Sequence, residues 1–418
     1  MKTTIAAERV LVPSRPPTLI DVASGPVLFA DLPEAGTLSG HRRLWGDVPR
    51  LSLDDLRAVL ADAAIAGRGG AGFPFAAKLA LAATARRCRV VVNAAEGEPA
   101  SAKDAALLTH APHRVLDGAA IVARTLGVGT VDVVLPGDRP AVHQAVCRAL
   151  ASRAAAAEPV GWRTTVAAAR FVSGQESAVL ELLAGRPGMP VTTWAPAAQP
   201  DRRGRANLVS NAETWAHVAA MLALGGEYTA YGTKAEPGTT LLTLRDQSGP
   251  DGGTTRATVR EVGYGTRWSD IVAGPESGGS PAILLGGFHG TWLPNSTLQR
   301  LPVSRAAVAE AGASLGAGVV YAVDSCPVAV TAAIVRYLAD ESARRCGPCR
   351  HGLPELADRV EELRERRAAD CTELRSVSGL VAGRGACRHP DGTVRLVHTL
   401  ERAFPDEVAA HLAGGCRW

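Results

Sequence analysis

At 418 residues the chain is too long for one ordinary domain, since domains of about 150 residues are usual. Its formal net charge of +4 and its 4% of aromatic residues argue against a nucleic-acid-binding surface, which is strongly basic and often aromatic. It has no run of about 18 uncharged apolar residues, and its first residues lack the apolar core of a signal peptide. We therefore expect a cytoplasmic protein with several domains and no membrane span.

Residues 1–44 are rich in Pro and Gly and show no sustained period, so we predict an N-terminal extension or loosely packed arm. Residues 51–66 have the apolar spacing of a helix, with Ser52 or Asp54 as its N-cap. This predicted helix leads directly into a glycine-rich loop.

The glycine-rich loop places four glycines within six residues, and a short helix-forming stretch over 76–82 follows it. Arg68 and Lys78 add positive charge on either side. A loop of this kind exposes its backbone N–H groups and opens a helix, which is the usual setting for an anion. The first hypothesis is a phosphate cradle, and the alternative is an ordinary turn in a glycine-rich chain. The glycines are Gly67, Gly69, Gly70 and Gly72.

Residues 45–235 alternate short apolar runs with helical stretches, which predicts an α/β domain with a parallel sheet. Strands are expected at 89–93, 130–137 and 163–166, and helices at 116–126 and 141–155. A ligand of such a sheet binds at the carboxyl ends of its strands.

Three polar turns are candidates for that position. Asn93, Glu96 and Glu98 form an acidic turn that suits hydrogen bonds from ribose hydroxyls or a flavin N–H, or else a solvated surface turn. Gly174 lies at the bend of a predicted strand–turn–helix junction over 171–180. Asn211 and Thr214 could contact phosphate or flavin oxygens, or Asn211 could cap a helix.

The pattern of predicted elements changes twice after residue 235. Residues 236–325 suggest a small α+β domain with strands at 239–244, 257–262 and 282–287 and a helix beginning at 268–272. Residues 326–418 read as mostly helical and carry Cys346, Cys349 and Cys387. The C-x-x-C spacing leaves open an iron–sulfur cluster, a zinc site or unrelated thiols. The other cysteines, namely Cys88, Cys147, Cys326, Cys371 and Cys416, give no sequence reason for a ligand role.

Taken in order, these motifs resemble the flavin-bearing, NADH-oxidising subunit of respiratory complex I and related subunits of NAD-linked hydrogenases and formate dehydrogenases. The resemblance covers roughly residues 45–415, and residues 67–74 match the family's loop without a change. It implies an FMN- and NADH-binding α/β domain, a β-grasp domain over 236–325 and a helical iron–sulfur domain over 326–418.

The resemblance also implies roles for single residues. It places FMN against the loop glycines and a set of polar residues, which are Gly67, Arg68, Gly69, Gly70, Gly72, Lys78, Asn93, Gly174, Asn211 and Thr214. It places NADH beside Phe73, Glu96, Glu98, Glu176 and Arg205, and Gln175 belongs to the same motif as Glu176. It assigns Cys346, Cys349 and Cys387 as ligands of an iron–sulfur cluster, which is [4Fe–4S] in the family.

The sequence departs from the family pattern at several positions, including Arg205, where the family usually has Lys. Ala95 and Gln175 replace carboxylates near the flavin, and Leu81 replaces an aromatic residue near the adenine. Ala343 stands where the first cluster ligand is expected, and a methyl group cannot bind iron. The cluster could then be a [3Fe–4S] centre, a cubane completed by an oxygen or nitrogen ligand, or absent.

The leading hypothesis is a flavoprotein that accepts a hydride from NADH on FMN and passes single electrons to iron–sulfur carriers. No catalytic acid, base or nucleophile is demanded. A ferredoxin-like protein or a membrane reductase is the expected partner. The alternatives are a non-catalytic binding or assembly protein that keeps the fold, and a zinc-bound structural module at the C-x-x-C.

Overall fold

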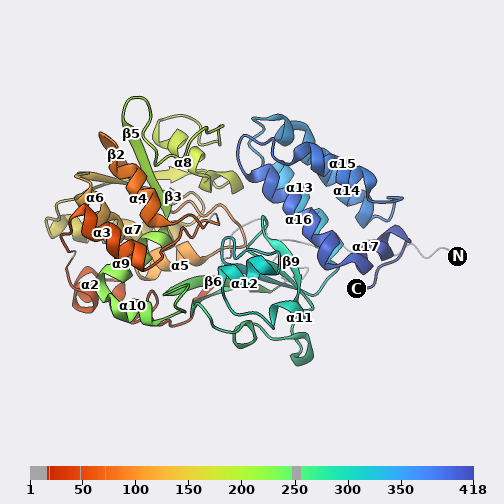
Figure 1. Ribbon diagram of the computed structural model, residues 1–418, viewed down its shortest axis with the longest axis horizontal. Coiled ribbons are helices and arrows are strands. Elements are labelled where there is room, and N and C mark those ends of the chain that lie inside the picture. Colours follow the sequence, from red (N-terminus) through yellow and green to blue (C-terminus); the bar gives the residue numbers. More distant parts are fainter. Residues whose placement is uncertain (1–16, 18, 48, 71, 247–255) are drawn as a thin grey trace.

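A computed structural model gives the structure of the chain and describes residues 17, 19–47, 49–70, 72–246 and 256–418. Three parts follow one another along the sequence (Figure 1). An α/β part lies at one end, a mixed-sheet part lies beside it, and a group of helices forms the other end.

The first part is built on a four-stranded parallel sheet with the order β4-β3-β2-β5. The apolar residues 90–92 of β2 are fully buried, as expected of a parallel sheet covered on both faces. The bounds are β2 Arg87–Asn93, β3 Thr130–Pro136, β4 Gly161–Ala167 and β5 Arg205–Asn211.

Helices connect these strands and cover the sheet. The N-cap Ser52 accepts a hydrogen bond from the Asp55 backbone N–H at 3.1 Å, which fixes the start of α3. The helices are α1 Leu32–Ala35, α2 Leu38–Trp45, α3 Leu53–Asp62, α4 Phe75–Ala83, α5 Lys103–His110, α6 Pro112–Thr125, α7 Pro140–Ala155, α8 Glu176–Leu183, α9 Ala212–Leu224 and α10 Gly226–Ala230, with a 3₁₀ turn η1 at Phe171–Gly174.

The second part is a six-stranded mixed sheet with the order β1-β7-β6-β10-β8-β9. Strand β10 runs parallel to β6 and antiparallel to β8. The bounds are β1 Leu19–Val22, β6 Thr239–Asp246, β7 Arg256–Gly263, β8 Ala282–Leu285, β9 Thr291–Pro294 and β10 Val319–Val323, with helices α11 Asn295–Leu298 and α12 Arg305–Glu310 and 3₁₀ turns η2 Trp268–Asp270 and η3 Pro275–Ser277.

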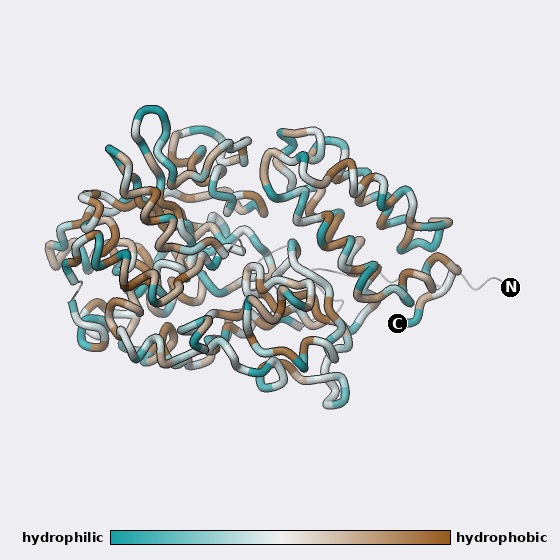
Figure 2. Tube along the Cα trace, viewed as in Figure 1, coloured by the Kyte–Doolittle hydropathy of each residue, from teal (hydrophilic) through white to brown (hydrophobic). Residues whose placement is uncertain are grey.

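The third part consists of helices that bury apolar faces against one another. Hydrophobic and hydrophilic residues alternate along them in Figure 2, as expected of amphipathic helices around a shared core. The helices are α13 Pro327–Asp340, α14 Leu353–Arg364, α15 Thr372–Val381, α16 His389–Ala403 and α17 Pro405–Leu412, and a short π-helical turn, η4 Pro348–Gly352, precedes α14.

The structure differs from the sequence-based expectations in several places. The helix expected to begin at 268–272 is only the 3₁₀ turn η2. Part of the predicted N-terminal arm pairs as β1 with β7, and α1 and α2 pack on the first part; residues 1–16 and 18 lie outside the described residues. Strand β5 was not predicted, because its mixed composition hides a buried strand. The segment expected as a strand before Gly174 is the 3₁₀ turn η1, because it leads straight into α8.

Candidate functional site

The carboxyl ends of β2 and β5 bring two of the predicted polar residues side by side. Asn93 and Asn211 are direct partners in the parallel register of these strands. The Asn93 side-chain amide donates a 2.9 Å hydrogen bond to the Gly174 carbonyl, so η1 is held at the same edge. The sequence-based expectation that these turns gather at one end of the sheet is therefore met by the fold.

The glycine loop lies next to this edge and is closed at its base. The Gly67 N–H donates to the Phe73 carbonyl at 2.8 Å. Gly70 and Gly72 have φ of 97° and 62°, a region that favours glycine. A Cβ added at Gly69 or Gly72 would meet no atom within 4 Å, so open space lies against the loop.

Lys78 on α4 points toward the same edge. Its ammonium group donates to Glu176 Oε2 at 2.7 Å and to the Val209 carbonyl of β5 at 2.6 Å. The second Glu176 oxygen accepts from the Ala197 N–H at 3.3 Å. A cation from α4 and a carboxylate from the start of α8 thus meet beside the strand ends, as both were predicted to do around a nucleotide.

Thr214 holds the glycine loop by a side-chain hydrogen bond and is itself bonded to Asn211. The Thr214 hydroxyl accepts the Arg68 backbone N–H at 2.9 Å and donates to Asn211 Oδ1. The Asn211 amide in turn lies 3.4 Å from Asp104 Oδ2. The Asn211 side chain makes no capping hydrogen bond to the backbone of α9; it contacts the Thr214 hydroxyl of that helix and Asp104 of α5, and it reaches the loop through Thr214.

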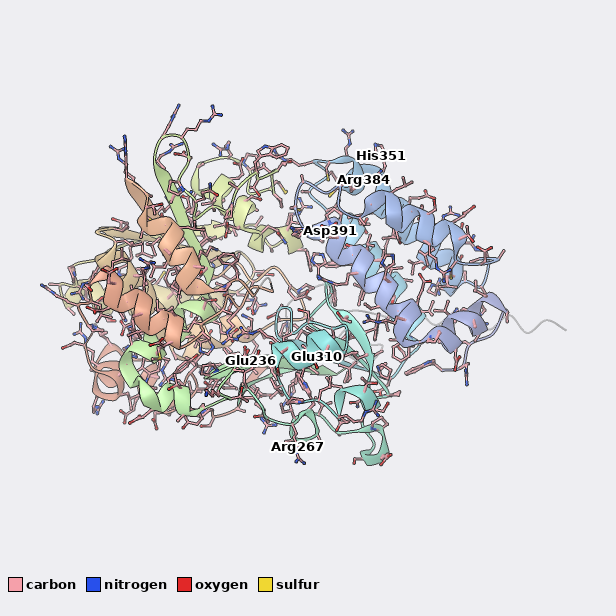
Figure 3. All side chains as sticks on the ribbon, viewed as in Figure 1. Glu236, Arg267, Glu310, His351, Arg384 and Asp391 are labelled. Atoms are coloured by element: carbon pink, nitrogen blue, oxygen red, sulfur yellow. The ribbon has the colours of Figure 1, made fainter. Side chains whose placement is uncertain are left out.

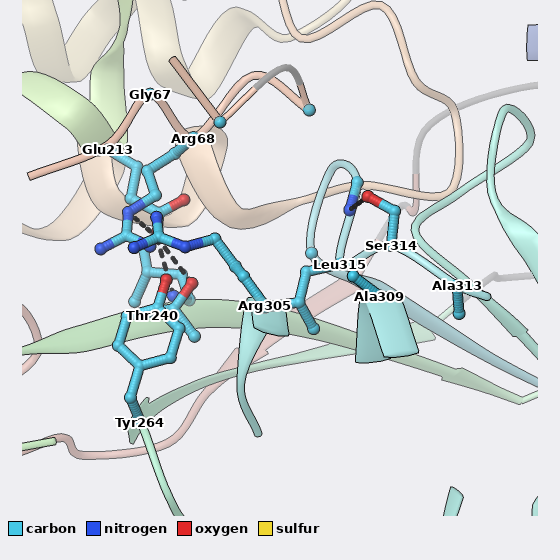
Figure 4. A pocket seen from close by; sticks show the side chains of 15 residues that line it. Gly67, Arg68, Glu213, Thr240, Tyr264, Arg305, Ala309, Ala313, Ser314 and Leu315 are labelled. Atoms are coloured by element: carbon cyan, nitrogen blue, oxygen red, sulfur yellow. Dashed lines mark hydrogen bonds and ion pairs between the residues drawn. The ribbon is translucent and has the colours of Figure 1, made fainter. Parts of the chain in front are cut away.

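Arg68 was expected to flank the loop together with Lys78 and to contact FMN. Its guanidinium group lies at a cavity of ≈ 210 Å³ between the first and second parts, which the loop glycines Gly67, Gly70 and Gly72 also line (Figure 4). It donates to the Thr239 carbonyl at 3.0 Å and lies 5.1 Å from the centre of the Tyr264 ring, which Arg305 approaches at 5.2 Å. Burial lowers the pKa of Arg68, and the Glu213 carboxylate opposes that effect. The side chain therefore connects the glycine loop to Thr239 and Tyr264 of the second part.

The acidic turn is engaged with the protein's own backbone. Glu96 accepts hydrogen bonds from the N–H groups of Asp104 and Ala105, each at 3.0 Å, at the start of α5, and it lies 3.0 Å from Arg139. It thereby caps this helix. The position of Glu96 beside NADH, which the resemblance implies, stays a prediction.

Glu98 connects the acidic turn to the second part. Its carboxylate accepts the Phe288 N–H at 2.8 Å and the Ala100 N–H at 3.1 Å. Burial raises the pKa of Glu98 to about 7, although both hydrogen bonds favour the charged form. The carboxyl group therefore titrates near neutrality at the junction of two domains.

The remaining predicted nucleotide residues are dispersed. Gln175 is the N-cap of α8 without a side-chain capping bond, and Phe73 is 46% exposed. Arg205 begins β5 and pairs with Asp201 at 2.7 Å, at the opposite end of the strand from Asn211. The structure does not bring Arg205 to the glycine loop, and its role toward NADH stays a prediction.

Sequence reasoning missed a buried group of charges behind the strand ends. Lys103 lies 2.9 Å from both Asp104 and Glu213, and Glu213 accepts the Leu241 N–H at 2.9 Å. Burial alone would raise the pKa of Glu213, but Lys103, His217 and Arg68 together outweigh burial and lower it. Lys103 and Asp104 follow the acidic turn directly and Glu213 precedes Thr214, so their proximity to the motifs was the available signal.

The three predicted cluster ligands come together in the third part. Burial raises the pKa of the Cys349 thiol, and the neighbouring Cys346 and Cys387 thiols raise it further. Figure 3 places Arg384 and Asp391, which flank Cys387 in sequence, near the end of the helical part that faces the first part. Ala343, at the expected fourth position, packs against the hydrophobic core.

A segment just before Gly174 links the nucleotide edge to the cysteines. The Phe171 N–H donates to Glu341 Oε2 at 3.0 Å, and Arg170 donates to the carbonyl of Ser342 at 3.3 Å. The Phe171 ring also packs on His289 and His389, at 4.6 and 5.4 Å between ring centres. Direct contacts therefore join η1 to the segment that follows α13 in the helical part.

Comparison with known proteins gives two matches along the chain. The Nuo51 FMN-binding domain matches residues 60–220, and the NADH-ubiquinone oxidoreductase-F iron-sulfur binding region matches residues 329–411. An NADH-quinone oxidoreductase subunit of Mycobacterium tuberculosis is 28% identical over 87% of this chain and 85% of that protein. The NADP-reducing hydrogenase subunit HndC of Solidesulfovibrio fructosivorans is 27% identical over 83% and 74% of the two chains.

A solved structure is similar over most of the same range. The NAD⁺-reducing [NiFe]-hydrogenase in its H₂-reduced state superposes with a TM-score of 0.74 at 28% identity, covering 86% of this chain. This chain spans 63% of the length of that hydrogenase chain. Within the described ranges, none of the helices is long and apolar enough to cross a membrane.

Proposed function

Because this chain belongs, as a divergent member, to the family of FMN-binding NADH-quinone oxidoreductase subunits and related hydrogenase subunits, we propose that it is a flavin-dependent, NADH-oxidising electron-transfer protein. The observation that carries the proposal is the meeting of the open glycine loop, the Lys78–Glu176 pair and the Asn93–Gly174 contact at one edge of the parallel sheet.

These residues fit an FMN molecule. The space against Gly69 and Gly72 admits a ligand close to the backbone, and Lys78 supplies a cation next to it. Bound FMN supplies acceptance of a hydride from NADH and release of single electrons. Asn93, Gly174 and the loop would hold the flavin, while Glu176 would orient the nicotinamide nucleotide from the start of α8.

The cysteines fit a cluster better than a single ion. Among the described residues, the group of side chains close enough to share one ion does not include Cys346, Cys349 and Cys387. Thiolates that each bind a different iron must lie farther apart than thiolates on one ion. Since Ala343 offers no ligand, we propose that these three thiolates hold an iron–sulfur cluster whose fourth position is not a cysteine at 343.

The contacts between Phe171 and the 341–342 segment support electron transfer from the flavin edge toward this cluster. We assign residues 236–325 as the β-grasp domain of the family, because they supply five of the six strands of the mixed sheet; the edge strand β1 comes from Leu19–Val22. Because the relatives are subunits of larger assemblies, we further propose a ferredoxin-like or membrane-reductase partner. The cytoplasmic location stays a prediction.

An anaerobic preparation of the full chain tests the proposal. We expect FMN as the released flavin, and NADH-dependent reduction of ferricyanide that requires this flavin. A protein that retains FMN but does not reduce ferricyanide with NADH would instead support a non-catalytic protein with the same fold. A protein that takes up no flavin at all would contradict the proposal and would likewise support a non-catalytic protein with the same fold.

A further inference from the structure

We propose that a second metal site, which binds zinc, closes the C-terminal end of the helical part. We call its four side chains the C-terminal cluster: Cys326, Glu407, His411 and Cys416. Their ligand atoms all lie within 4.8 Å of one another. The three cysteines assigned to the iron–sulfur cluster are separate from this group, so the inference does not depend on the proposed function.

The four side chains come from three places in the sequence. Cys326 is the N-cap of α13, and Cys416 lies beyond the end of the last helix. Glu407 and His411 are four residues apart on α17, so they share one face of that helix. Packing of α17 against the start of α13 brings all four groups together.

The distances match a tetrahedral ion after a small adjustment. Cys326 Sγ lies 3.2 Å from His411 Nε2 and 3.3 Å from Glu407 Oε1. Cys416 Sγ and His411 Nε2 each lie 3.1 Å from the same Glu407 oxygen. Zinc bonds of about 2.0–2.3 Å place tetrahedral ligands roughly 3.3–3.8 Å apart, so an expansion of a few tenths of an ångström admits the ion.

Surrounding contacts orient the ligands. His411 Nδ1 lies 3.1 Å from the Leu363 carbonyl, which can only accept, so Nδ1 carries the proton and the Nε2 lone pair faces the cluster. The outer Glu407 oxygen accepts the Arg417 N–H at 3.0 Å, which leaves Oε1 turned inward. Both His411 and Glu407 are only 3% exposed. A histidine and a carboxylate held in this way are typical of the ligands of a metal site and their supporting contacts.

The donor set selects the metal. Two thiolates, one imidazole and one carboxylate suit a tetrahedral zinc ion, whereas Mg²⁺ and Ca²⁺ prefer oxygen ligands. Four protein ligands leave no open position, which is typical of structural rather than catalytic zinc. Cys326 and Cys416 also lie outside residues 329–411, the range of the iron–sulfur region match.

The ion would tie the chain terminus to the rest of the molecule. Beyond Cys416, Trp418 packs edge-on against Phe404, with ring centres 6.0 Å apart. Phe404 in turn packs against Trp292 of the second part at 5.9 Å. Zinc at the C-terminal cluster would therefore fix α17, the terminal residues and the junction with β9.

Metal analysis of the full chain, purified without chelators, tests the inference. We expect about one zinc per chain in addition to any iron. After removal of zinc, added Co²⁺ should give the visible and near-ultraviolet bands of tetrahedral cobalt with thiolate ligands. The Cys326→Ser/Cys416→Ser double variant should lose the zinc and the cobalt spectrum while its iron and flavin contents remain unchanged.

Cys371→Ser is the matched control, because Cys371 is a buried thiol of the same helical part outside both cysteine groups. This variant should keep its zinc. The cobalt spectrum of the unaltered chain decides the question even if the double variant does not fold. Absence of tetrahedral cobalt uptake, full zinc retention by the folded double variant, or a Cys326–Cys416 disulfide in the purified chain would each overturn the inference.

Discussion

Gly72 shows how a single backbone position can serve a ligand. Its φ of 62° and the open space at its Cβ position mean that a side chain there would project toward the space assigned to the flavin. Gly127 has a φ of 67° and equally open surroundings, but it follows α6 far from the loop in sequence. Comparing the same substitution at the two glycines therefore separates the effect of backbone strain from the effect on ligand contact.

We predict that Gly72→Val weakens FMN binding by at least about tenfold, which corresponds to about 1.4 kcal/mol. Gly127→Val should leave FMN affinity unchanged. Both substitutions should lower the free energy of unfolding similarly, by about 1–3 kcal/mol, because both force a branched side chain into a left-handed conformation. Fluorescence titration with FMN and urea unfolding check the pair. Equal flavin affinity in the two variants would remove the loop from the flavin site.

The contribution of Glu98 to the free energy of unfolding decreases as the pH rises, which is the reverse of the usual behaviour of a carboxyl group. Its pKa rises from 4.5 to about 7 on folding, so between these values the folded chain binds more protons than the unfolded chain. The free energy of unfolding contributed by Glu98 is therefore complete below about pH 4.5 and decreases as the pH rises to 7, by at most about 1.4 kcal/mol per pH unit.

Glu98→Gln should remove this decrease, because an amide does not titrate. Urea unfolding from pH 4.5 to 8 should give a curve that is flatter than that of the unaltered chain. Glu310→Gln, at an exposed position, should reproduce the original curve. If Glu98→Gln also reproduced it, the carboxyl group would not be protonated in the folded state near neutrality.

At the scale of elements, α6 and α9 pack closely because Gly118 has no side chain. A Cβ at Gly118 would lie 1.9 Å from the Trp215 carbonyl oxygen of α9. Gly379 on α15 is also helical, but a Cβ there would meet no atom within 4 Å. Only the first glycine is therefore required for packing.

We predict that Gly118→Ala lowers the free energy of unfolding by about 2–3 kcal/mol, because rigid backbone must move apart. Gly379→Ala should raise it by about 0.5–1 kcal/mol, because alanine favours the helix. Chemical unfolding measures both changes. A neutral Gly118→Ala variant would show that α6 and α9 are not packed at this distance.

Elements with strong periodicity could be predicted from the sequence, and weakly patterned ones could not. Strands β2 and β3 are apolar runs and were found within a few residues of their bounds. Strand β5 contains Arg205, Asn207, Ser210 and Asn211, so nothing in its composition indicates a buried strand. Its register against β2 nevertheless places Asn211 beside Asn93. Pairing between distant segments supplies that information, and a single sequence does not contain it.

In the candidate site, the sequence indicated which residues take part but not the direction in which their side chains point. Its loop, Asn93 and Lys78 were identified from glycine content, strand ends and charge. The sequence could not show that Arg68 turns toward Tyr264, or that Glu96 caps α5, because both depend on neighbours brought in by folding. Likewise Cys326 and Cys416, more than 80 residues apart, become neighbours of one histidine only in the folded chain.

At the scale of the whole molecule, the proposed flavin site lies in the first part and the three cysteines lie in the third part. Both of these parts contact the second part. Glu98 contacts Phe288 of the second part, and Phe171 contacts His389 of the third. We therefore propose that electrons from NADH enter at the glycine loop and leave toward the cysteines, which are Cys346, Cys349 and Cys387.

An anaerobic titration of the purified chain with NADH, followed by its visible absorption, tests this route of electrons from end to end. We expect the flavin band near 450 nm to bleach with about one equivalent of NADH, and further NADH to lower the broad iron–sulfur absorption. A flavin band that is bleached by dithionite but is indifferent to excess NADH would contradict the proposed route.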